Sequence, residues 1–210
     1  MAKAEPVTPP PALLRAERAD LCLEFADTRF WRGTPAPTET LKVPADLLAW
    51  CGANAALDAA SLRAVEAQWK DAPPRAAAAF AEALSLRETI FAIFSATAQG
   101  MAPRADELAA FNQALDRAPR RAMLAPAADG YAWQVAPPRN APSLLAAVLW
   151  SGGDLLAGPR RLRVRQCANP QCQWLFLDDS KSGTRRWCSM SACGNRAKAH
   201  RHYLRVKGGG

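Results

Sequence analysis

The sequence contains little histidine and no long hydrophobic run. Both histidines, His200 and His202, lie near the C-terminus, so residues 1–159 contain none. The same residues lack a glycine-rich phosphate-binding loop and a nucleophile elbow, the usual signals of nucleotide-dependent and hydrolytic enzymes. No apolar run approaches the roughly 18 residues that a membrane-spanning helix requires. We therefore expect neither an enzyme nor a membrane protein.

The first residues do not have the pattern of a secretory signal peptide. Residues 1–11 are rich in proline and have no apolar segment, so we expect a disordered lead rather than a signal peptide. In the reducing cytoplasm paired cysteines favour metal binding over disulfide formation. Two of the six cysteines, Cys22 and Cys51, lie apart from the others among apolar neighbours. We expect these two to be buried structural thiols.

Positive charge is concentrated at one end of the chain. Residues 160–210 contain 12 Lys and Arg residues and two acidic ones, a net charge of +10. Residues 1–159 contain 15 basic and 17 acidic residues, a net charge of −2. Concentrated positive charge on a small module points to a polyanion such as DNA, RNA or an anionic membrane surface. A merely solubilising charged surface is the simpler alternative.

Apolar residues recur at helical spacing through most of residues 12–159. The clearest case is residues 75–99, where Phe80, Leu84, Phe91 and Phe94 follow the helical repeat. Further helices are expected over residues 44–54, 60–70, 104–117 and 142–156. A β-hairpin is expected at residues 123–124 and 131–135, and a loop over residues 33–40. The sequence thus predicts a mainly α fold with a small β-hairpin, an α+β domain.

The segment 20–30 fits two structures. Its Leu21, Leu23 and Phe25 alternate as in a strand, while Leu21 and Phe25 also fit one face of a helix. Leu13 and Leu14 extend the apolar pattern upstream, which favours the helix.

Four cysteines form two matched pairs near the C-terminus. Cys167 and Cys172 enclose four residues, Cys188 and Cys193 enclose four more, and fifteen residues separate the pairs. Each short loop can bring two thiolates onto one metal, as a tetrahedral Zn²⁺ site requires. We expect one structural Zn²⁺, because four cysteines close the coordination sphere and leave no position for a catalytic water. His200 and His202 lie at least about 10 Å farther along a helix, too far to be ligands.

The rest of residues 160–207 fits a small zinc finger. Strands are expected at residues 161–166 and 174–177, a turn at residues 178–183, and a helix that begins with the second cysteine pair and runs to about residue 206. A metal-binding turn, a hairpin and a helix that starts at two ligands form a treble-clef-like arrangement. Residues 208–210 are three glycines and are expected to be a flexible tail.

Several motifs resemble a known pair of domains. Trp-Leu-Phe-Leu-Asp at 174–178, Arg-Arg-Trp-Cys-Ser-Met at 185–190 and Cys-Gly-Asn-Arg-Ala-Lys at 193–198 resemble the CGNR zinc finger. Leu-Cys-Leu-Glu-Phe-Ala-Asp-Thr at 21–28 and Leu-Arg-Glu at 86–88 resemble the ABATE domain, a stress-induced transcription regulator that usually precedes it. The resemblance implies a bacterial DNA-binding regulator with a helical, ligand-sensing domain. Ala26 and Asp27 depart from that family, which more often has an apolar residue and Asn there.

The basic residues around the second cysteine pair are the candidate contacts to double-stranded DNA. Arg and Lys side chains hold phosphates, and Asn195 can read adenine through two hydrogen bonds or can cap the helix start instead. The candidates are Arg185, Arg186, Asn195, Arg196, Lys198, Arg201 and Arg205. Arg185, Arg186 and Arg196 could equally offset the negative charge of four zinc-bound thiolates. Because one such module buries little surface, we expect a homodimer in the cytoplasm, associated with the nucleoid.

A zinc module that binds RNA or protein is the alternative. Trp174, Phe176 and Trp187 could stack on unpaired bases if they were exposed. Their position beside the cysteines favours packing in the core of the finger.

Arg87 is the anomaly of the N-terminal domain, because it lies on the apolar face of the helix at 75–99. A buried guanidinium requires an anionic partner. We expect a structural pair with Glu24 or Asp27. The other interpretation makes Glu24, Asp27 and Arg87 a ligand site, in which Arg87 holds a small acidic effector.

Overall fold

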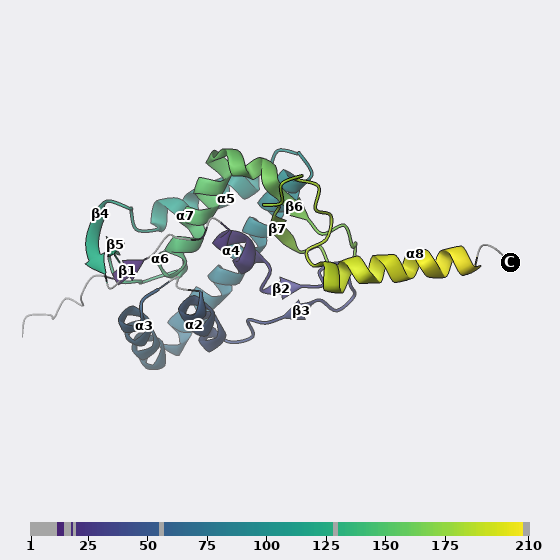
Figure 1. Cartoon of the computed structure of the whole chain (residues 1–210). Coiled ribbons are helices and arrows are strands. Elements are labelled where there is room, and N and C mark those ends of the chain that lie inside the picture. The colour runs from purple at the N-terminus through teal and green to yellow at the C-terminus, as the bar shows by residue number, and fades with distance from the viewer. Residues whose placement is uncertain (1–11, 15–17, 19, 55–56, 128–129, 208–210) are drawn as a thin grey trace, which may run out of the picture.

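The computed structural model describes residues 12–14, 18, 20–54, 57–127 and 130–207, apart from the side chains of 12–14, 200–202 and 204–206. The expected lead at 1–11 and tail at 208–210 lie outside these residues. The described chain is mostly helical with three small antiparallel sheets (Figure 1), which confirms the α+β class. None of its described helices is long and apolar enough to cross a membrane.

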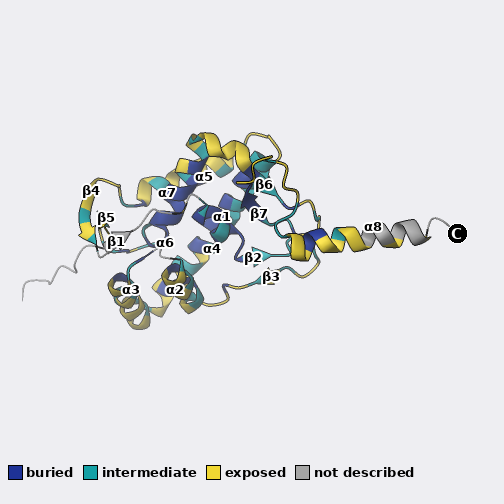
Figure 2. Cartoon of the chain, viewed as in Figure 1, coloured by how far each residue is buried: buried dark blue, intermediate teal, exposed yellow. Residues whose placement is uncertain are grey.

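Helix α4, Pro73–Ala98, is the central element of the fold. It begins two residues before the expected start, because proline fits the first helical turn, where an N–H has no partner within the helix. Its face with Leu86, Ile90, Ile93 and Phe94 is buried (Figure 2). The periodicity of the sequence is confirmed, and the buried apolar surface is what holds this helix in place.

Helix α4 packs against several others, four of which lie before residue 118. They are α1 Leu21–Ala26, α2 Pro44–Ala53, α3 Ala59–Asp71 and α5 Ala105–Arg117. The segment at residues 20–30 thus forms a helix and not a strand over Leu21–Ala26, and this helix is short. A two-residue strand β2, Arg29–Phe30, follows it and pairs with β3, Thr38–Glu39, which lies inside the expected loop.

The expected helix at 142–156 is divided in two. Helix α6 spans Ala141–Leu144 and α7 spans Ala146–Ala157. The side chain of Asn140 caps α6 by accepting a hydrogen bond from the N–H of Ser143 at 2.9 Å. Most of α7 is buried, and it packs against α1, α5 and α6.

The expected hairpin is confirmed as β4, Met123–Ala127, and β5, Gly130–Val135. A third strand, β1 Ala12–Leu14, pairs antiparallel with β5. Leu13 and Leu14 thus belong to a strand, and the expectation that they extend the apolar pattern of a helix is wrong. The strand order is β1-β5-β4. A strand of three residues has too short a pattern to be recognised from sequence.

The C-terminal segment begins with a 3₁₀ helix, Pro159–Arg163, where a strand was expected, and continues into β6, Val164–Gln166. Strand β7, Leu175–Leu177, pairs with β6, and a π-helical turn, Met190–Gly194, leads into α8, Asn195–Lys207. Val164, Leu175 and Leu177 belong to the same buried cluster as the helices. The hydrophobic core therefore continues from the N-terminal domain into the β6–β7 hairpin.

Candidate metal centre and nucleic-acid interface

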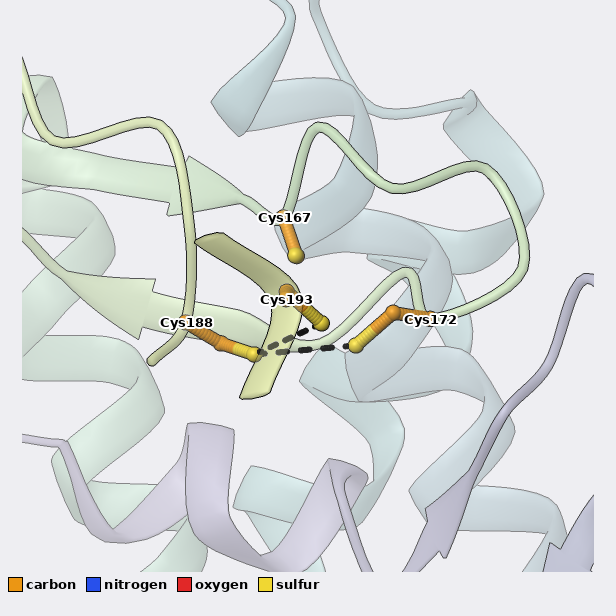
Figure 3. Close-up of side chains that lie close together, drawn as sticks. All are labelled: Cys167, Cys172, Cys188 and Cys193. Atoms are coloured by element: carbon orange, nitrogen blue, oxygen red, sulfur yellow. Dashed lines mark hydrogen bonds between the residues drawn. The ribbon is translucent and has the colours of Figure 1, made fainter. Parts of the chain in front are cut away.

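The four paired cysteines converge at one point. Cys167 and Cys172 come from the turn between β6 and β7, Cys188 precedes the π-helical turn, and Cys193 lies within it (Figure 3). All four Sγ atoms lie within 4.8 Å of one another. The Sγ atom of Cys188 is 3.6 Å from that of Cys172 and 3.7 Å from that of Cys193. A tetrahedron of thiolates with Zn–S bonds of about 2.3 Å has edges of about 3.8 Å, so the donor set fits one such cation.

The environment of these thiols also suits a cation. Three of the four are buried and Cys188 is half-buried. Burial, with repulsion from the neighbouring sulfur atoms, raises the pKa of Cys172 to about 12 and raises the pKa of Cys188 as well. By contrast, the pKa of Cys193 is lowered: burial raises it, but hydrogen bonds from Asn169 and the other cysteines outweigh that effect. Four thiolates this close together require a positive charge between them.

Groups around the cysteines hold this arrangement. The amide nitrogen of Asn169 donates to the Sγ atom of Cys193 at 3.7 Å, and sequence analysis did not single out this residue. The guanidinium of Arg185 donates to the carbonyl oxygens of Trp187 and Cys188 and lies 4.5 Å above the ring of Phe176. Arg185 is thus a candidate DNA contact whose guanidinium is already engaged in the loop of the second cysteine pair.

Asp178 fixes the turn that leads to the second pair. Its carboxylate accepts hydrogen bonds from the hydroxyl and the N–H of Ser180 and from the N–H of Arg185, at 2.5, 3.1 and 2.8 Å. These bonds hold the pKa of Asp178 below its ordinary value, and the bond from the Ser180 hydroxyl has the largest effect. The ionised carboxylate therefore keeps the loop closed at neutral pH.

Helix α8 projects away from the rest of the molecule (Figure 1), and its main contacts are with the π-helical turn at its start. Arg196 and Lys198 are exposed on its first turns, and Asn195 is exposed and donates from its side-chain amide to the carbonyl of Ser191 at 3.2 Å. Arg201 and Arg205 belong to α8, but their side chains lie outside the described part of the chain.

Arg186 and Arg196 border a cavity of about 630 Å³ beside the cysteines, with Asn169 and Trp187 also in its wall. The guanidinium of Arg186 lies 5.5 Å from the ring of Trp187, and that of Arg196 lies 4.6 Å from the ring of Trp31. Within the described residues, neither guanidinium is paired with a carboxylate. Two uncompensated arginines therefore meet at one apolar recess.

Comparison with known families matches both parts of this arrangement. The model of the ABATE family, described as "Putative stress-induced transcription regulator", matches residues 19–159. The chain belongs to the ABATE family. The model of the CGNR zinc finger matches residues 163–206. A comparison with curated proteins finds no match.

The CGNR motif is visible in the geometry of residues 193–196. Cys193 contributes a sulfur atom to the cluster, and a Cβ at Gly194 would stand 2.9 Å from the side chain of Met190. Asn195 and Arg196 then open α8 on the exposed side. The glycine thus lets the π-helical turn close against Met190 while the next two side chains face outward.

In the ABATE domain, Arg87 is buried, with 2% of its side chain exposed, as expected. The expected pairing of Arg87 with Glu24 or Asp27 is wrong. The two terminal nitrogens of the guanidinium donate to the two carboxylate oxygens of Glu39, each at 2.6 Å, and Nε donates to Glu88 at 3.0 Å. Glu24 is paired with Arg18 instead. The strand β3 carries Glu39 to Arg87, in a segment that was expected to be a loop.

Asp27 contacts the CGNR finger rather than Arg87. One carboxylate oxygen, Oδ1, accepts a hydrogen bond from the N–H of Leu175 in β7 at 3.1 Å. The other, Oδ2, is buried without a partner in the described residues. Burial raises the pKa of Asp27 well above its ordinary value, and the hydrogen bond from Leu175 and the charge of Arg32 lower it only in part.

The loop after β2 connects the ABATE domain to the finger, and its contacts were not predicted from the sequence. Trp31 packs on the cysteine cluster with a φ of 54°, a left-handed conformation that bulky residues rarely adopt. Arg32 donates to Glu88 at 2.6 Å and lies 3.9 Å above the ring of Phe91. Gly33 donates its N–H to the carbonyl of Gln171 at 3.2 Å. The run of aromatic, basic and glycine residues at 30–33 was its sequence signal.

Proposed function

We propose that this protein is a zinc-dependent transcriptional regulator that binds double-stranded DNA through its CGNR finger. The ABATE domain then senses a ligand, and the protein acts in the cytoplasm at the nucleoid. The observation that carries the proposal is the pair Arg186 and Arg196, which are exposed beside the cysteine cluster and have no carboxylate partner in the described residues.

One structural Zn²⁺ is the proposed cofactor. The spacing of the four sulfur atoms fits a single tetrahedral ion, and the four cysteines would fill its coordination sphere. Such a closed site has no open position for substrate or water, so the proposed role is structural and the proposed function is not enzymatic. The ion would compensate the thiolates and fix the start of α8, on which the candidate DNA contacts lie.

Charge and shape both support DNA as the partner. The projecting helix α8 carries Arg196 and Lys198 on exposed positions, and Arg201 and Arg205 follow in its sequence. A helix of this width fits the major groove of B-DNA. Arg186 and Arg196 then contact phosphates next to the groove, while Asn195, exposed at the start of α8, is placed to read a base edge.

The packing of the aromatic residues argues against the RNA-stacking alternative. Phe176 is buried with the cysteines, and Trp174 and Trp187 are partly buried against the same cluster. Recognition of single strands by stacking requires exposed aromatic faces. These rings instead contribute to the core of the finger.

We propose a homodimer that contacts DNA with two fingers. Exposed apolar side chains on the β4–β5 hairpin, Met123, Leu124 and Tyr131, support an interface there. Sedimentation velocity of the wild type and of Leu124→Lys tests it: a dimer that dissociates in the variant is expected, and a wild-type monomer at micromolar concentration contradicts it.

A fluorescence-anisotropy titration tests the DNA-binding proposal. Zinc-loaded protein is titrated against a mixed set of genomic duplexes and against single-stranded RNA of matched length, before and after chelation. We expect binding to the duplex that chelation abolishes. Equal binding to single-stranded RNA supports the alternative, and no binding to either at low salt assigns the finger to protein interactions.

A further inference from the structure

The ABATE domain contains a cavity of about 550 Å³ that is separate from the finger. Helix α3, the start of α4, the segment before α6 and α6 itself form its walls. Figure 1 places α3 and α6 on the side of the molecule away from α8. The volume lies in the range of small-molecule binding sites, which are usually apolar pockets with a few polar groups.

The floor of the cavity is apolar. Val65 of α3 and Leu144 of α6 belong to the hydrophobic core, with 4% and 1% of their surfaces exposed. Trp69, one turn after Val65, is partly buried and contributes an aromatic wall. These side chains are held by the core, so the apolar surface exists before any ligand binds.

Two arginines, Arg75 and Arg139, supply all the charge of the lining, which contains no Asp or Glu. Neither guanidinium forms a salt bridge within the described residues. Arg63 and Arg120 of the same domain also form no salt bridge within the described residues, but they do not line this cavity, and other arginines are paired. Arg117, which lines a smaller cavity, is paired with Glu82 at 2.5 Å, and Arg121 is paired with Asp154 at 2.6 Å.

The position of Arg75 is unfavourable for the helix that carries it. It lies in the first turn of α4, where the partial charge of the helix end is positive and acidic residues are preferred. No acidic residue is present in this turn. A cation placed against a local preference, at the mouth of a cavity, indicates a role outside helix stability.

The backbone that carries Arg139 is fixed. The N–H groups of Arg139 and Asn140 both donate to the hydroxyl oxygen of Ser143, at 2.9 and 3.0 Å. The side-chain oxygen of Asn140 accepts from the N–H of Ser143 in return. The second arginine therefore stands on a closed capping box and not on an open loop.

We propose that this cavity binds a small organic carboxylate with a flat apolar body of about one or two rings. Arg75 and Arg139 bind the carboxylate, and Trp69 and Leu144 contact the apolar body. Arg87 cannot serve this purpose, because Glu39 and Glu88 already occupy its guanidinium. The proposal gives the sensing role a site and thus rests on the proposed function, but ligand binding to the cavity can be measured without DNA.

Helix α4 links the cavity to the finger. Arg75 lies at its start, Glu88 binds Arg32 near its middle, and Ser95 accepts a hydrogen bond from the side chain of Gln166 in β6 at 3.1 Å. The helix has 26 residues and spans about 39 Å. A ligand that shifts the start of α4 would act on the contact of Ser95 with the finger, and on the bond between Glu88 and Arg32 in the loop that packs on the finger.

Isothermal titration calorimetry of the full-length protein tests the site, with benzoate, phenylacetate and 1-naphthoate as probes and the corresponding amides as neutral controls. We expect saturable binding of at least one acid below about 5 mM, with its amide at least tenfold weaker. Arg75→Gln/Arg139→Gln should weaken binding at least tenfold. Arg63→Gln/Arg120→Gln removes the same charge elsewhere and should leave binding unchanged.

The proposal is overturned if none of the three acids binds, if an amide binds as well as its acid, or if the two double variants behave alike. Circular dichroism verifies that both variants are folded. A second titration measures DNA affinity with the bound acid at saturation. The regulatory role is supported if the acid changes the DNA affinity of the wild type and Arg75→Gln/Arg139→Gln abolishes that change. It is contradicted if the wild type binds DNA with the same affinity whether or not the acid is bound.

Discussion

Gly33 of the ABATE domain packs directly on the backbone of Pro170 in the first metal-binding turn. A Cβ at Gly33 would stand 1.8 Å from the carbonyl oxygen of Pro170, closer than any side chain tolerates. The adjacent carbonyl, of Gln171, accepts the N–H of Gly33. The two domains are therefore in contact beside the cysteine cluster, and the finger is not an independent appendage.

This contact predicts that Gly33→Ala is strongly destabilising. The clash is with the backbone of Pro170 and Gln171, which cannot rotate aside as a flexible side chain can. The loop must therefore move away from the cysteines, at a cost of about 2–3 kcal/mol. Urea unfolding of the zinc-loaded protein measures the effect. Gly153→Ala is the matched control, since its Cβ would meet only Leu115 at 4.0 Å, and it should be neutral or slightly stabilising. Equal effects would contradict the proposed packing.

Removal of one sulfur ligand should remove the metal. Cys188→Ser leaves three thiolates, and we expect less than about half of the wild-type zinc content after dialysis against a chelator, with loss of the finger's structure. Elemental analysis and circular dichroism measure both effects. Cys51→Ala changes a thiol that is buried far from the cluster in the core, and its zinc content should equal that of the wild type. Retention of zinc by Cys188→Ser would show that the four cysteines do not act together.

The buried carboxyl group of Asp27 should give the free energy of unfolding an unusual pH dependence. Burial raises its pKa in the folded chain, so the folded state holds this proton more tightly than the unfolded state does. The resulting stability is fully present below the unfolded pKa of about 3.9 and is lost as the pH rises through the folded pKa, by about 1.4 kcal/mol for each unit of difference.

Asp27→Asn should flatten this dependence, because it keeps an oxygen for the N–H of Leu175 and cannot ionise. Urea unfolding between pH 5 and pH 8 tests this, with Asp71→Asn, at an exposed position, as the control for the loss of one charge. Parallel curves for Asp27→Asn and the wild type would disprove the assignment.

In the pair of Arg87 and Glu39, removal of the acid should cost more stability than removal of the base. Glu39→Ala leaves a guanidinium that is 2% exposed, with Glu88 as its one remaining acidic partner in the described residues and the Thr28 hydroxyl as a neutral one, and it should cost about 3 kcal/mol. Arg87→Leu leaves Glu39, which is 31% exposed and can be hydrated, and it should cost less.

Glu82→Ala breaks the exposed pair with Arg117 and should cost at most about 1 kcal/mol. Free energies of unfolding in urea rank the three variants. If Arg87→Leu were the most harmful, the pair would not be the main reason for the burial of Arg87.

Local patterns in the sequence account for most of the helices and for the cysteine cluster. The apolar repeat of residues 75–99 is long enough to predict α4, and the spacing of the cysteines predicts their convergence. The partner of Arg87 could not be predicted, because Glu39 reaches it through the two-residue strand β3, and such short elements depend on tertiary contacts. The packing of Trp31 on the finger also joins residues distant in sequence, and no periodicity marks it.

The most direct test of DNA binding by the finger is the salt dependence of duplex affinity. A plot of log affinity against log salt should have a slope of about −4 to −6 for each finger bound. Arg186→Gln/Arg196→Gln should reduce its magnitude by about 2. Arg63→Gln/Arg120→Gln should retain the wild-type slope, because it removes the same charge from the ABATE domain. A duplex affinity that does not depend on salt, or the same slope in both double variants, would contradict DNA binding by the finger.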